Sequence, residues 1–71
     1  MIHFVKTVEN ENKIVYKMIP EELYGTVEYC KKTNEVHFYK DGTEYKSSDN
    51  QIAFNYVVEA GFPEEYLYAT H

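Results

Sequence analysis

The chain has 71 residues, enough for one domain close to the lower size limit for folding without disulfides or metals. Twelve acids against seven basic residues give a net charge of −5, and every basic residue is lysine. This balance disfavours direct nucleic-acid binding, because phosphates repel an acidic surface and arginine, the forked donor for phosphates and guanine edges, is absent.

The N-terminal part of the sequence predicts a β-hairpin. Residues 2–9 and 13–19 alternate apolar and polar side chains, and Asn10-Glu11-Asn12 between them is typical of a turn. The expected buried face of the hairpin consists of Ile2, Phe4, Val8, Ile14, Tyr16 and Met18. Pro20 then starts a single helical turn that Gly25 ends, and we expect Leu23 and Tyr24 to pack against the sheet edge.

Three short strands are predicted next, at residues 26–31, 36–40 and 43–47. Asp41-Gly42 favours a type I′ turn, which places Phe38 opposite Tyr45. A two-residue turn at Thr33-Asn34 would place Tyr29 opposite Phe38 and Cys30 opposite His37, giving an aromatic row on the inner face. The expected outer face carries Glu28, Cys30, His37, Tyr39, Glu44 and Lys46.

A capping-box pattern, with Ser48 as N-cap and Gln51 three residues later, predicts a helix from Asp49 to Ala60 that ends at Gly61. The stripe expected to cover the sheet is Ile52, Ala53, Tyr56, Val57 and Ala60. Phe54 and Val58 fall off this stripe, so either the sheet curls around the helix or they face a partner. Residues 64–71 are expected to add one turn, held by Leu67. These elements predict an α+β domain over residues 1–71, with about five antiparallel strands, a sheet that could curl strongly, and one C-terminal helix.

Few residues of the sequence suggest a catalytic or metal-binding site. Cys30 and His37 are the only nucleophile-and-base pair, but the sequence places no oxyanion site or cleft beside them. The histidines and the cysteine lie on different elements without ligand spacing, so we expect no metal and no cofactor. One cysteine excludes an internal disulfide, and the first ten residues lack signal-peptide order, so the expected location is the cytoplasm, without membrane contact.

The charge is unevenly distributed. Residues 1–46 hold eight acids and seven lysines, whereas residues 47–71 hold four acids and neither lysine nor arginine. The same segment is rich in aromatic residues, of which Tyr66 and Tyr68 are expected outside, unless they tuck the tail on to the sheet. The candidate partner-binding residues are Asp49, Glu59, Glu64, Glu65, Tyr66 and Tyr68; no catalytic residue is assigned.

The expected function is therefore that of a small, acidic, non-enzymatic module that binds the basic surface of a larger protein. Size and charge are typical of inhibitors from phages and mobile elements, some of which mimic nucleic acid with carboxylates. Two alternatives remain: a self-associating accessory domain, including a homodimer, and a small enzyme using Cys30 and His37.

Overall fold

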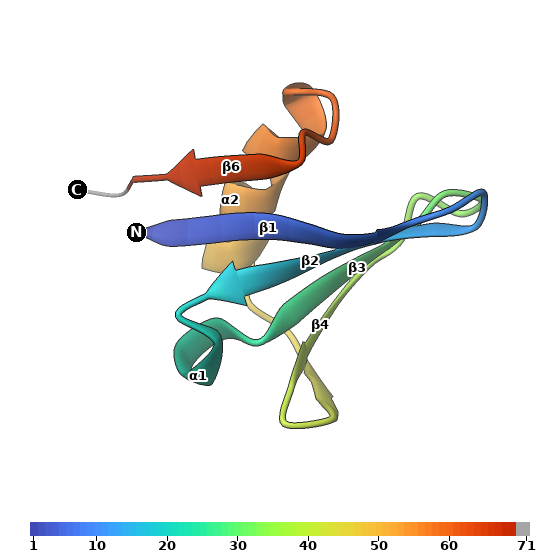
Figure 1. Ribbon diagram of the computed structural model, residues 1–71. Helices are drawn as coiled ribbons and strands as arrows, with labels where there is room; N and C mark the ends of the chain where they lie inside the picture. Colours follow the sequence, from blue (N-terminus) through green and yellow to red (C-terminus); the bar gives the residue numbers. More distant parts are fainter. Residues whose placement is uncertain (70–71) are drawn as a thin grey trace.

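The computed structural model describes residues 1–69 and shows an antiparallel sheet of six strands with one main helix packed against it (Figure 1). The elements are β1 (Ile2–Glu9), β2 (Lys13–Ile19), α1 (Glu21–Tyr24), β3 (Thr26–Cys30), β4 (Val36–Lys40), β5 (Thr43–Tyr45), α2 (Ser48–Glu59) and β6 (Glu65–Tyr68). The strand order is β5-β4-β3-β2-β1-β6. The predicted α+β class is confirmed. The sixth strand arises because residues 65–68 pair with β1 instead of forming the predicted helical turn.

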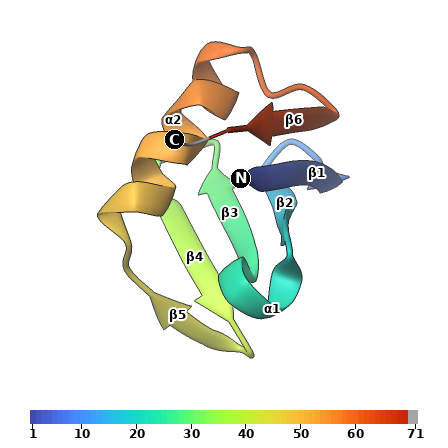
Figure 2. The same ribbon diagram turned by 90° about the vertical axis from the view of Figure 1, so that its left-hand side faces the viewer.

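The sheet is strongly curved, and α2 lies along its concave side (Figure 2). The buried core joins both layers: Phe4 and Tyr16 from the first hairpin meet Phe54 of α2, with ring centroids 5.9–6.2 Å apart. Met18 and Val27 complete the centre of the sheet and are fully buried. The curvature therefore allows one helix to cover strands from both halves of the sheet.

The first hairpin contains a bulge that the sequence did not reveal. The β1–β2 register shifts between Lys6 and Val8, so Val8 pairs with Val15 and is exposed. The prediction that Val8 lies on the buried face was wrong, because the extra residue in the bulge reverses the alternation of side chains.

The predicted register of β3, β4 and β5 was right for one pair of strands and wrong for the other. Asp41 and Gly42 have φ of 53° and 77°, and Phe38 pairs with Tyr45 as expected. Across the preceding connection, however, Phe38 pairs with Val27 rather than Tyr29, because residues 31–35 form a longer loop than the predicted two-residue turn. The row across these three strands is therefore Val27, Phe38 and Tyr45.

Gly25 links α1 to β3 in a conformation that suits glycine alone. Its φ is 78° and its ψ is −132°, and a Cβ atom at this position would lie 2.0 Å from the carbonyl oxygen of Tyr39. This close approach holds α1 beside the end of β4. Of the two α1 side chains expected to pack, Tyr24 contacts the core but Leu23 is 64% exposed.

The second helix begins one residue earlier than predicted and buries a different face. Ser47, not Ser48, is the N-cap, and its hydroxyl accepts a hydrogen bond from the Asn50 amide at 3.2 Å. At the other end the predicted role of Gly61 is confirmed by its φ of 82°. Ala53, Phe54 and Val57 belong to the core, Val58 packs against it, and Asn50 is buried near the start of the helix.

The predicted stripe of α2 was therefore wrong for Ile52, Tyr56 and Ala60, which are exposed. Phe54 and Val58, which fell outside the stripe, pack into the core because the sheet curls around the helix. This leaves large apolar side chains on the solvent side of α2.

Candidate functional site

The four acids of the C-terminal segment do not form one cluster. Asp49 and Glu59 lie at opposite ends of α2. Glu65, at the start of β6, lies 2.9 Å from the Nε2 atom of His3. The neighbouring Glu64 lies 3.8 Å from the Nζ atom of Lys6, so β1 supplies basic groups to two of the four acids.

The tyrosines of β6 face inward. Tyr66 and Tyr68 are only partly exposed and pack against the core, because β6 joins the sheet beside β1. The expectation that they lie outside was wrong, and the alternative, in which they tuck the tail on to the sheet, is correct. Leu67, expected to hold a helical turn, is 58% exposed on the opposite face of β6.

The two residues of the candidate catalytic pair, Cys30 and His37, are not directly opposite each other in the sheet. Glu28, not Cys30, lies opposite His37, and His37 Nδ1 is 2.6 Å from a Glu44 carboxylate oxygen. This hydrogen bond raises the pKa of His37, whereas hydrogen bonds from the Thr33 hydroxyl and nearby backbone amides lower the pKa of Cys30. Within residues 1–69, no group of three or more His, Cys, Asp or Glu side chains is arranged to hold a metal ion.

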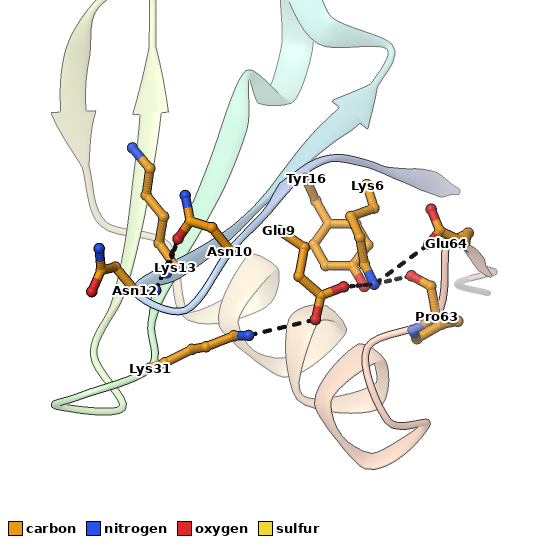
Figure 3. Close-up of polar contacts among 9 residues, drawn as sticks. All are labelled: Lys6, Glu9, Asn10, Asn12, Lys13, Tyr16, Lys31, Pro63 and Glu64. Carbon is orange, nitrogen blue, oxygen red and sulfur yellow. Dashed lines mark hydrogen bonds and ion pairs between the residues drawn. The ribbon is translucent and has the colours of Figure 1, made fainter.

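A network of charges lies at the end of the molecule where β1 and β2 turn (Figure 3). The Lys6 ammonium group, with only 9% of its side chain exposed, lies 2.6 Å from Glu9, and the Glu9 carboxylate also faces Lys31 at 3.6 Å. The nearby Tyr16 hydroxyl donates to the Pro63 carbonyl at 2.5 Å, and burial raises the pKa of Tyr16 to about 12. The charged groups of this network pair with one another, and the hydrogen bond between Tyr16 and Pro63 links the first hairpin to the segment before β6.

The opposite end of the sheet presents a groove of about 590 Å³ with a mixed apolar and polar lining. Its lining residues come from the N-terminal end of the chain, α1, the start of α2 and the end of β6, and Figure 2 shows where these elements lie. Its apolar walls are Met1, Leu23 and Ile52, and all three side chains are at least half exposed. Tyr68 also lines the groove, and its ring contacts that of Tyr56 in a tilted arrangement with centroids 5.4 Å apart.

A fixed polar network forms part of the groove lining. Asn50 Nδ2 donates to the Tyr45 hydroxyl at 2.8 Å, and this hydroxyl donates to the Tyr24 carbonyl. Burial raises the pKa of Tyr45, so the hydroxyl remains a donor. Asp49 also lines the groove, and it forms no ion pair with any of the residues described.

An acidic hollow of about 660 Å³ lies on the other side of α1. Glu21 and Glu22 from α1 and Asp41 from the β4–β5 turn line it. Leu23 and Asp41 both border a smaller depression between the hollow and the groove, so the three form one continuous surface around α1. We call the groove, the acidic hollow and this depression the α1 surface.

Of the sequence-predicted site residues, only Asp49 and Tyr68 lie on the α1 surface. The sequence analysis missed the contributions of Met1, Leu23 and Ile52. One available signal was the shortness of α1: a single turn that begins with two acids cannot bury both Leu23 and Tyr24.

Comparison with known proteins gives no family assignment. No family model matches the chain, and searches of curated proteins and of solved structures found no match. Within residues 1–69, no helix is long and apolar enough to span a membrane.

Proposed function

We propose that this protein is a non-enzymatic binding module that docks on a basic surface of a larger protein through the α1 surface. The observation that carries this proposal is that Met1, Leu23 and Ile52, which are all exposed, line the same groove as Asp49. Large exposed apolar side chains around a groove with a polar rim are typical of protein-interaction sites.

The acids of the α1 surface indicate the charge of the partner. Glu21, Glu22 and Asp41 border the hollow. Among the described residues, Glu21 is the only one of these three acids that forms an ion pair, with its carboxylate 3.7 Å from Lys17 Nζ, and Lys40 borders the adjoining depression. A basic partner would be attracted by this field and oriented by it. An inhibitor that covers a nucleic-acid-binding surface is one function that this chemistry fits.

The enzyme alternative is the less favoured one, because Glu28 rather than Cys30 lies directly opposite His37. The α1 surface contains neither residue. We therefore assign no catalytic role to this pair.

The proposal is tested by selecting a random peptide library on the immobilised protein. We expect the selected peptides to combine apolar residues with lysine or arginine, and to lose binding to the Leu23→Ser/Ile52→Ser double variant. Leu67→Ser is the matched control, since Leu67 is exposed to a similar degree but does not line the groove. Peptides that are acidic, or that bind the double variant as well as the native protein, would contradict the proposal.

Self-association is a second candidate function, favoured by the free edge of β6. The Lys6 amide donates to the Glu64 carbonyl at 2.8 Å, so antiparallel alternation directs the backbone groups of Glu65 and Leu67 away from β1. A second copy could pair with this edge. Light scattering over a wide concentration range would show a dimer that Leu67→Pro abolishes; a monomer throughout would exclude this function.

A further inference from the structure

We propose that the groove of the α1 surface receives a basic side chain, arginine or lysine, from the partner. This inference rests on the proposed function and specifies how the partner is recognised. It follows from three features of the groove, which are its apolar walls, its aromatic residues and its acid.

The apolar walls match the aliphatic part of a basic side chain. Leu23 and Ile52 stand on different helices at the sides of the groove and are 64% and 51% exposed. Lysine and arginine carry three or four methylene groups that pack on apolar surface while the charged end stays in a polar environment. A short or fully polar side chain would leave these walls in water.

The aromatic side chains favour a cation over a neutral group of the same length. Tyr24, Tyr45 and Tyr68 all line the groove. A cation near the face of such a ring is attracted by the quadrupole of the ring, and the planar guanidinium group also stacks on it.

Asp49 supplies the charge that completes the site. Its carboxylate belongs to the first turn of α2, where the helix terminus carries about half a positive charge. The full negative charge of the Asp49 carboxylate is larger than this partial positive charge. Asp49 forms no ion pair among the described residues.

Asn50 provides a directional contact beside Asp49. The Asn50 side chain is 7% exposed and is held by its bond to the Tyr45 hydroxyl. Its Oδ1 atom forms no hydrogen bond among residues 1–69. No fully buried side-chain oxygen in this part of the chain lacks a partner, so Oδ1 keeps some exposure to solvent. An N–H group of a guanidinium or ammonium ion would satisfy it.

The test uses N-acetyl-arginine methylamide as the probe and N-acetyl-citrulline methylamide as its neutral isostere. Each is titrated into the isotopically labelled protein and followed by two-dimensional NMR. We expect the arginine compound to shift the signals of Leu23, Ile52 and the Asn50 side-chain amide in a saturable way. The citrulline compound should bind about tenfold more weakly, since it lacks the charge.

Two variants of α2 locate the charge that matters. Asp49→Asn should weaken binding of the arginine compound by about five- to tenfold, because one charge-assisted interaction is lost. Glu59→Gln removes the same charge from the far end of the same helix and should change the affinity less than about twofold, since the intervening distance exceeds the screening length. Equal binding of the two compounds, absence of saturable shifts, or an unchanged affinity of Asp49→Asn would each overturn the inference.

These outcomes separate the inference from the proposed function. If the arginine compound fails while the Leu23→Ser/Ile52→Ser variant still loses the selected peptides, the groove binds a partner through an apolar side chain. If the peptides also bind that variant normally, the α1 surface is not the docking site at all.

Discussion

Two substitutions in α2 distinguish the observed helix face from the one that the sequence predicted. Phe54 is fully buried, and its ring centroid lies 6.0 Å from that of Phe4 and 5.9 Å from that of Tyr16. Phe54→Ala should therefore cost about 3–5 kcal/mol, through lost apolar burial and the cavity that remains. Ile52 is about half exposed, so Ile52→Ala should cost about 1 kcal/mol or less.

The difference is large on the scale of this protein. A domain of this size has a total stability of about 4–11 kcal/mol, and each kcal/mol corresponds to about 4–8 °C in Tm. We expect Phe54→Ala to lower Tm by at least about 12 °C or to leave the chain unfolded. Thermal melts followed by circular dichroism measure both variants, with Phe54→Leu as an intermediate. A loss for Ile52→Ala equal to or larger than that for Phe54→Ala would refute the observed helix face.

Three further predictions concern a cap, two glycines and one buried hydroxyl. Ser47→Ala should cost about 1 kcal/mol by removing the cap acceptor, whereas Ser48→Ala should change stability little; equal losses would place the cap wrongly. Gly25→Ala should lower the free energy of unfolding in denaturant by about 2–5 kcal/mol, because the new Cβ would lie 2.0 Å from a backbone oxygen. Gly61→Ala has open space around it and should cost only about 1–2 kcal/mol, so equal costs would contradict the close approach at Gly25. The pKa of Tyr16 is about 12 in the folded state, above the usual value of 10.0. The protonated hydroxyl therefore contributes its full stability below about pH 10, and this contribution is lost as the pH rises towards 12. Unfolding curves of Tyr16→Phe measured across this range should lack the Tyr16 part of the loss.

Local signals in the sequence predicted the turns well and the long-range pairing less well. Asp41-Gly42 fixed the β4–β5 register because the turn itself requires two residues with positive φ. The connection at Thr33-Asn34 has no such requirement, and its register was wrong by two residues. Because side chains in a strand alternate with a period of two, this even error left each side chain on its predicted face. The bulge in β1 is an odd shift, which is why Val8 changed face.

The helix face could not be chosen from sequence for a different reason. Apolar residues occur around most of α2, including Ile52, Phe54 and Val58, so periodicity does not select one side. The curvature of the sheet decides, since Phe54 packs into the core against Phe4 of β1 and Tyr16 of β2. Curvature is a property of the whole sheet, and no short window of the sequence encodes it.

The groove is still less predictable, because it joins segments that are far apart in the chain. Met1, Leu23, Ile52 and Tyr68 come from the N-terminus, α1, α2 and β6. The sequence pointed to Asp49 through the charge asymmetry and to Tyr68 as an aromatic residue of the same acidic segment. That asymmetry, however, pointed to the C-terminal segment, whereas Glu21, Glu22 and Asp41, from the charge-balanced part, lie around α1.

Assembly from distant segments also means that the groove exists only in the folded chain, so an occupant must stabilise the fold. At a concentration one hundred times its Kd, an occupant adds about 2.7 kcal/mol, which corresponds to a rise in Tm of about 10–20 °C. If Asp49→Asn weakens binding tenfold, the same concentration should give about half of this rise, while Glu59→Gln should give all of it. The measurement is a thermal melt of each variant with and without the arginine compound. The same rise in native protein and in Asp49→Asn would show that the occupant binds without the Asp49 carboxylate.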